Sequence, residues 1–86
     1  MSYEVIIPKP VTKQLDNIPK QVRSRIIEKI LSLAEEPRPS KVKKLKGFDN
    51  EYRVRVSDYR IRYEIDDKTL TVIVLHCKHR QDIYKQ

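Results

Sequence analysis

Between positions 52 and 65 the sequence YRVRVSDYRIRYEI alternates apolar and charged residues, and this alternation limits the fold more than any other feature. Successive side chains of a β-strand point to opposite faces, so each half of the segment predicts a strand with one buried face. Ser57 and Asp58 interrupt the pattern and indicate a turn between the two strands. We therefore expect a hairpin whose buried face carries tyrosine, valine and isoleucine, and whose other face carries Arg53, Arg55, Arg60 and Arg62.

The first forty residues predict one strand and two helices. Residues 3–7 are largely β-branched and apolar, which favours a short strand that ends at the prolines that follow. Apolar residues then recur at helical spacing from Pro10 until Pro19 interrupts them, which predicts a first helix. Pro19 is expected as the first residue of a second helix, closed by Pro37. The apolar stripe of that helix comprises Val22, Ile26, Ile30 and Leu33, widened by Ile27 and Ala34.

The segments around the hairpin complete the predicted fold. Residues 37–50 form a basic connector, and residues 70–77 hold a near-continuous apolar run, which predicts a central strand covered on both faces. The order strand, helix, helix, strand, strand, strand predicts an α+β fold, with an N-terminal strand and a helical hairpin packed on one face of a largely antiparallel sheet. The connector lysines are either a solvated loop or an electrostatic anchor for RNA, and they are Lys41, Lys43, Lys44 and Lys46.

Composition restricts the partners and the cellular setting. The 86 residues carry a formal net charge of +7, and residues 41–86 hold twelve Lys or Arg against seven acids, so a polyanionic partner is expected in that half. The single cysteine, Cys77, excludes an intrachain disulfide and a cysteine-based zinc finger, and it favours the cytoplasm. No apolar run approaches a membrane span, and the N-terminus lacks a signal-peptide pattern. We expect one domain over residues 1–86, in the cytoplasm, with nucleic acid favoured over an anionic membrane.

The arginine face of the hairpin is the first candidate functional site. Like charges on paired strands repel, so folding alone gives no reason to collect four guanidinium groups there. An anion is the natural complement, because arginine pairs two-fold with phosphate oxygens and also stacks on exposed bases; Lys44 and Lys46 would add phosphate contacts. The alternative is a solvated charge lattice, in which acids on the same face neutralise the arginines; these acids are Glu51, Glu64 and Asp66.

The polar tail beyond the last strand is the second candidate site, with His79, Arg80 and Tyr84. RNA cleavage requires removal of a 2′-hydroxyl proton, stabilisation of a crowded phosphorane, and protonation of the departing 5′-oxygen. Neighbouring guanidinium groups would lower the pKa of Tyr84 and make it a base, with His79 or Arg80 as proton donor. The alternative is that all three are ordinary surface residues. The remaining residues expected to serve packing are Tyr3, Tyr52, Tyr59, Tyr63, His76 and Cys77.

Two motifs, YRVRVSDYRIRYEI and HRQDIY, resemble in their order and spacing the C-terminal half of the RelE and ParE superfamily of bacterial and archaeal toxins. The stretches YEVIIPKPVTKQLDNIPKQV and KLKG extend the resemblance over nearly the whole chain. It implies a compact toxin of the RelE type, with a microbial-ribonuclease-like fold, that enters the ribosomal decoding site and cuts the mRNA there. A small antitoxin is implied to hold it inactive. No metal and no small-molecule cofactor is expected.

The resemblance also implies roles for individual residues. Arg60, in the DYR segment, is implied to bind the scissile phosphate. Arg80, in the tail motif, is implied to contribute phosphate binding and proton donation, and Tyr84 to act as the base. The residues implied to balance phosphate charge on the preceding strand are Arg53 and Arg55.

The sequence departs from the family pattern in two places. Some members carry lysines where this chain has Arg53 and Arg55, and a guanidinium group gives up a proton with difficulty, so proton donation could shift toward His79. The chain ends two residues after Tyr84, so we do not expect an antitoxin to act by displacing a C-terminal helix. ParE-like relatives share the fold but act on DNA gyrase, and a non-catalytic RNA-binding module is a third interpretation. The residues that favour the ribonuclease are Arg53, Arg60, Arg80 and Tyr84.

Overall fold

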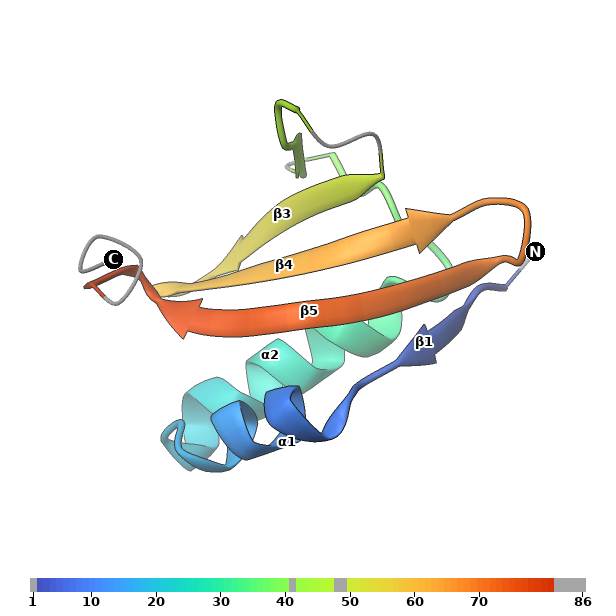
Figure 1. Ribbon diagram of the computed structural model, residues 1–86. Helices are drawn as coiled ribbons and strands as arrows, with labels where there is room; N and C mark the ends of the chain where they lie inside the picture. Colours follow the sequence, from blue (N-terminus) through green and yellow to red (C-terminus); the bar gives the residue numbers. More distant parts are fainter. Residues whose placement is uncertain (1, 41, 48–49, 82–86) are drawn as a thin grey trace.

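The alternating segment forms the hairpin that its pattern predicts (Figure 1). Strand β3 covers Glu51–Val56, and strand β4 covers Tyr59–Asp66 in the antiparallel direction. The computed structural model describes residues 2–40, 42–47 and 50–81. The register places Arg53 opposite Arg62 and Arg55 opposite Arg60, so the four arginines share one face of the hairpin.

Three further strands extend the hairpin into a five-stranded sheet with the order β1-β5-β4-β3-β2. Strands β5 and β2 pair antiparallel with β4 and β3, whereas β1 pairs parallel with β5. The predicted, largely antiparallel sheet is therefore confirmed. The bounds are Glu4–Ile6 for β1, Lys43–Lys44 for β2 and Thr71–His79 for β5.

Both helices pack on the same face of the sheet, which confirms the predicted α+β architecture (Figure 1). Helix α1 covers Lys9–Asp16 and helix α2 covers Lys20–Ser32. Pro19 immediately precedes α2 and is not its first residue as predicted, because its ψ of 139° is outside the helical region. Over the residues that the structure describes, neither helix combines the length and apolar character needed to span a membrane.

The hydrophobic core lies between the two helices and the sheet. Tyr63 is fully buried and donates its hydroxyl to the carbonyl oxygen of Pro37 at 2.7 Å. Burial raises the pKa of Tyr63, which keeps the phenol protonated as a donor. The helices and the residues that follow them contribute Val11, Leu15, Ile18, Ile26, Ile30 and Leu33, and the strands contribute Tyr52, Val54, Ile61, Ile65, Val72, Val74 and Cys77.

Two expectations about packing are wrong, and a third, that Tyr3 and Tyr59 serve packing, is met only in part. Strand β5 is central, but only its helix-side face is covered, so Leu75 remains 36% exposed on the other face. Ile27 is exposed on α2 and does not widen the buried stripe. Tyr3 and Tyr59 are only half-buried, because each lies near one end of the layer of core side chains. The connector also contains the short strand β2, which local sequence pattern does not indicate.

Candidate functional site

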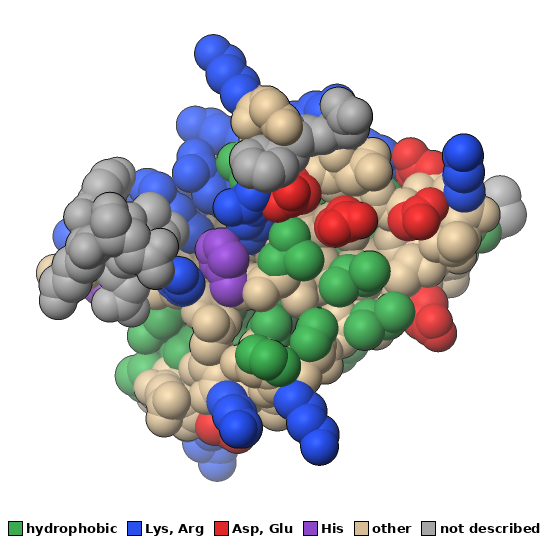
Figure 2. Space-filling model, viewed as in Figure 1, with side chains coloured by type: hydrophobic (Ala, Val, Ile, Leu, Met, Phe, Trp, Pro, Cys, Tyr) green, Lys and Arg blue, Asp and Glu red, His purple; other side chains and the backbone are tan. Residues whose placement is uncertain are grey.

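A hollow of about 110 Å³ opens among the cations of β2, β3 and β4. The described residues that line it are Lys43, Arg53, Arg55 and Arg60, and we call this site the cationic hollow. Strand pairing builds it, because Lys43 lies opposite Arg53 and Arg55 lies opposite Arg60. Figure 2 shows Lys and Arg side chains gathered on one part of the molecule, beside separate acidic and hydrophobic areas.

The cationic hollow is suited to an anion. Like charges directly opposite one another on paired strands destabilise a sheet, and no acidic residue of the described part of the chain lines the hollow. Guanidinium groups form short, charge-assisted hydrogen bonds with phosphate oxygens, often two at a time. A phosphate group would therefore relieve the repulsion and use donors that converge from three strands.

The neighbouring part of the same face is neutralised. Arg62 donates from Nε to Glu51 Oε1 at 2.6 Å, and the two side chains are only 28% and 18% exposed. Glu64 lies opposite Glu51 in the register. The charge lattice considered as an alternative is therefore present around Arg62, while the cationic hollow lies beyond it. Arg62, a predicted phosphate-binding residue, is thus held by an acid of its own strand pair.

Asp58, in the turn between β3 and β4, brings the tail arginine beside the hollow. The amide of Arg80 donates to the carbonyl oxygen of Asp58 at 2.8 Å, and its Nε lies 3.9 Å from Asp58 Oδ1. The same carboxylate oxygen is 3.9 Å from Arg55, whose Nε also donates to the carbonyl oxygen of Ser57 at 2.9 Å. Arg80 is thereby placed next to Arg55, at the edge of the hollow. Sequence reasoning assigned no role to Asp58, although its position between the arginine strands was visible.

The connector lysines differ in their position relative to the cationic hollow. Lys44 and Lys46 are exposed and do not line the cationic hollow, whereas Lys43 does. Lys44 lies opposite Tyr52, which is buried, and Lys43 lies opposite Arg53. Lys43 could have been selected among the connector lysines only from the register of β2 with β3, and the sequence pattern does not indicate β2.

His79 lies on the other side of the sheet. It is opposite Tyr59, and the two rings meet edge to face with their centroids 5.1 Å apart. Its Nδ1 accepts a hydrogen bond from the amide of Gln81 at 3.2 Å. The structure therefore connects Arg80 through Asp58 to Arg55 of the hollow, and it does not bring His79 there. Tyr84 lies outside the described residues.

His76 and Cys77 lie on opposite faces of β5 near this end. His76 is opposite Arg62, and burial, followed by the charges of Lys78 and Arg62, lowers the pKa of its imidazole, which keeps it neutral. Burial raises the pKa of the Cys77 thiol to about 11. Within residues 2–40, 42–47 and 50–81, no three His, Cys, Asp or Glu side chains gather as a metal site requires.

Comparison with known proteins agrees with this geometry. Residues 5–84 match the family model described as the ParE toxin of the type II toxin-antitoxin system, parDE. The chain is 35% identical to toxin RelE3 of Methanocaldococcus jannaschii, with 94% of each chain covered. It also superposes on the archaeal RelE-RelB complex from Pyrococcus horikoshii OT3 with a TM-score of 0.83 and 36% identity, covering 93% of this chain and 97% of that one.

A second solved structure, the toxin-antitoxin complex RelBE2 from Mycobacterium tuberculosis, gives a TM-score of 0.80 and 27% identity, with 93% and 100% of the two chains covered. Both structures contain a RelE-type toxin bound to its antitoxin. The match runs through the helices, the arginine strands and the tail motif alike. The chain therefore belongs to the RelE and ParE family of toxins of type II toxin-antitoxin systems, with its relatives on the RelE side.

Proposed function

We propose that this toxin is a ribosome-dependent endoribonuclease that cleaves mRNA in the decoding site and thereby stops translation in the cytoplasm. The observation that carries the proposal is the cationic hollow, where Arg60 lies opposite Arg55 and beside further cations from β2 and β3. Arg80 at its edge supplies a further guanidinium group. These groups converge where a phosphate that gains negative charge during cleavage would be stabilised.

The proposed chemistry divides three tasks among the residues. Arg60, with Arg53, Arg55 and Lys43 around it, holds the scissile phosphate and stabilises the phosphorane. Tyr84, four residues after Arg80 in the sequence, removes the proton from the 2′-hydroxyl; guanidinium groups beside a tyrosine favour its anion and so make it a base. Arg80 hydrogen-bonds to the departing 5′-oxygen and donates the proton with which this oxygen leaves as a hydroxyl group. Because fixed positive charge supplies the stabilisation, we propose a reaction that is independent of metal ions.

We also propose that a cognate antitoxin of the RelB kind covers this surface. The relatives from Pyrococcus horikoshii and Mycobacterium tuberculosis were each solved as a complex of toxin and antitoxin. A cationic surface favours an acidic partner segment, and an amphipathic helix is one form that such a segment takes.

The decisive experiment compares two targets with one protein. Purified toxin should cut mRNA on programmed ribosomes and leave the supercoiling activity of DNA gyrase unchanged. Tyr84→Phe keeps the ring but loses the ionisable oxygen, so single-turnover cleavage should fall by about 10² to 10⁴, as for other acid-base groups. Expression of the chain should arrest growth, and co-expression of the antitoxin, or use of Tyr84→Phe, should restore it.

The second candidate is inhibition of DNA gyrase, because the family model that matches the chain carries the ParE description. Loss of supercoiling with intact mRNA would establish that candidate. Tight ribosome binding with neither effect would instead indicate an RNA-binding module, and it would exclude the nuclease.

A further inference from the structure

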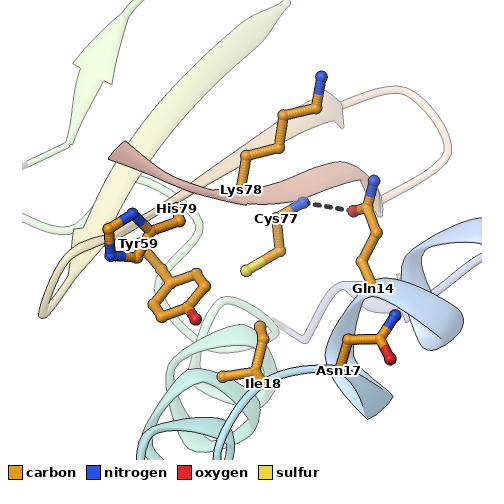
Figure 3. A pocket seen from close by; sticks show the side chains of 7 residues that line it. All are labelled: Gln14, Asn17, Ile18, Tyr59, Cys77, Lys78 and His79. Atoms are coloured by element: carbon orange, nitrogen blue, oxygen red, sulfur yellow. Dashed lines mark hydrogen bonds between the residues drawn. The ribbon is translucent and has the colours of Figure 1, made fainter. Parts of the chain in front are cut away.

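A second concavity lies at the same end of the sheet, on the helix side. It has a volume of about 330 Å³ and lies between the end of α1 and the ends of β4 and β5 (Figure 3). We call it the end pocket. Its volume is at the lower limit of the range typical of small-ligand sites. None of the roles proposed above uses it, although Tyr59 and His79, which line it, adjoin Arg60 and Arg80 in the sequence.

The walls of the end pocket are aromatic and apolar. The rings of Tyr59 and His79 stand nearly perpendicular, at 86°, so the two rings present differently oriented surfaces. Ile18 and Cys77 also line the pocket and are almost fully buried. A flat ring could therefore lie against one aromatic side chain while its edge meets the other.

Two carboxamides line the end pocket, together with the polar side chains of Lys78 and His79. Gln14 accepts a hydrogen bond from the Cys77 amide through Oε1 at 2.8 Å, which fixes its orientation and leaves its amide hydrogens available as donors. Asn17, at the end of α1, adds a second, exposed carboxamide to the pocket. The backbone amide of Gln81 donates a hydrogen bond to His79 Nδ1, so a neutral His79 carries its proton on Nε2. No described residue that lines the pocket is acidic.

This combination fits an unstacked nucleobase. Single-stranded RNA is recognised mainly by aromatic rings that stack on splayed bases and by polar groups that bind the base edges. Carboxamides pair two-fold with adenine, giving one hydrogen bond and accepting another. The absence of acids from the described lining suits a ligand attached to a phosphate.

Strand pairing connects the end pocket to the cationic hollow. Tyr59 and Arg60 are consecutive, so they point to opposite faces, and their partners on β5 are His79 and Lys78. The Tyr59–His79 pair faces the end pocket, and Arg60 lines the cationic hollow. A single RNA strand that crosses this end of the sheet can therefore place a phosphate on one face and a base on the other.

We propose that the end pocket binds one unpaired base of the RNA, with adenine preferred, adjacent to the phosphate held in the cationic hollow. This inference rests on the proposed ribonuclease function and adds a source of sequence preference to it. Tyr59 supplies the stacking surface, and Gln14 and Asn17 read the edge of the base.

The test is a thermodynamic cycle between protein and RNA. Full-length toxin in the Tyr84→Phe background, which should not cut, is titrated with short single-stranded RNAs in which each adenosine in turn is made abasic. At one position the loss of the base should weaken binding about 5- to 150-fold, as when one base–aromatic stack is removed. With Tyr59→Leu added, the same abasic substitution should have no further effect. Tyr3→Leu, at the other end of the sheet, is the matched control and should retain the full penalty.

A second variant makes the test independent of the packing of Tyr59. Asn17→Ala, at an exposed position, should keep the abasic penalty but lose the preference for adenine over uracil at that position. An abasic penalty that is the same in Tyr59→Leu and in its parent would overturn the inference. So would pocket variants that weaken antitoxin binding and leave RNA binding unchanged.

The two levels of the proposal fail separately. Suppose that Arg60→Ala weakens RNA binding while Tyr59→Leu changes the abasic penalty at no position. In that case RNA binds through the cationic hollow, and only the proposed base site is wrong. If RNA with all its bases does not bind and programmed ribosomes are not cut, the ribonuclease itself is wrong.

Discussion

The two ends of the sheet use arginine in opposite ways. At the end where β4 passes to β5, Arg38 donates to Asp67 at 2.9 Å and to the Tyr52 hydroxyl at 3.1 Å, with its guanidinium 5.2 Å from the Tyr52 ring centre. Tyr3 donates its hydroxyl to the same carboxylate at 2.7 Å. We call these four residues the Arg38 clamp. At the other end, the cationic hollow collects four cations without a described acid in its lining.

The difference separates a structural arginine from arginines that are placed to meet a ligand. In the Arg38 clamp, hydrogen bonds from Arg38 and then Tyr3 hold the pKa of Asp67 below its usual range, and Asp67 in turn satisfies the guanidinium. The positive charge of Arg38 is thus matched within the fold. In the cationic hollow the fold concentrates four cations on paired strands, with the Asp58 carboxylate 3.9 Å from Arg55 at one side, and this positive charge becomes useful when an anion arrives.

The largest expected effect is on catalysis. Arg60→Ala removes a group proposed to bind the scissile phosphate, so cleavage on programmed ribosomes should slow by about 10² to 10³, as when one donor to a developing negative charge is removed. Arg38→Ala removes the same side chain at the other end and should leave the rate per folded molecule unchanged. Single-turnover cleavage measures both, and equal losses would contradict the comparison.

A smaller effect is expected on stability, and it should arise at the end of the sheet that holds the Arg38 clamp. Tyr63→Phe deletes the hydroxyl that binds the buried Pro37 carbonyl beside the Arg38 clamp, so the free energy of unfolding should fall by about 1 to 3 kcal/mol. Tyr52→Phe should cost less, because its partner Arg38 remains accessible to water. Urea unfolding distinguishes the two, and neither variant should alter cleavage per folded molecule. A larger loss in Tyr52→Phe would show that the clamp bears more of the stability than the buried bond.

The smallest effect concerns the salt dependence of binding within the arginine face itself. Arg53→Ala with Arg55→Ala should reduce the slope of log affinity against log salt by roughly one for each phosphate that the variant no longer neutralises. Arg62→Ala should change the slope less, because Glu51 already neutralises Arg62. The slopes come from ribosome or RNA binding over a range of salt concentrations. An unchanged slope in the double variant would mean that these two arginines do not meet phosphate.

Local patterns in the sequence were sufficient to predict the hairpin and the common face of its four arginines. In a strand, the face to which each side chain points alternates with every residue, so it can be read from the local sequence without knowing the tertiary contacts. The helices were also predicted from a local pattern, apolar residues at helical spacing, and the predicted start of α2 at Pro19 is one residue before its observed start at Lys20.

The placement of His79 depends on a feature that no local pattern carries. The register between β4 and β5 shifts at Arg62 and Tyr63, where β5 holds one extra residue, Leu75. The shift reverses the alternation, so that Val74 and Cys77 both face the helices. His79 follows Cys77 onto that side, into the end pocket. Lys43 escaped prediction for a related reason, since its place in the cationic hollow depends on pairing with a distant strand.

The edges of the sheet have a consequence for the behaviour of the free chain. The two outermost strands are also the shortest, with three residues in β1 and two in β2. Short edges, one of them made of lysines, offer little backbone on which a second molecule could add a strand, and their charge opposes stacking into aggregates. Lys43 therefore opposes edge-to-edge pairing of the sheet as well as lining the cationic hollow. Its replacement by an uncharged residue would favour self-association of the protein.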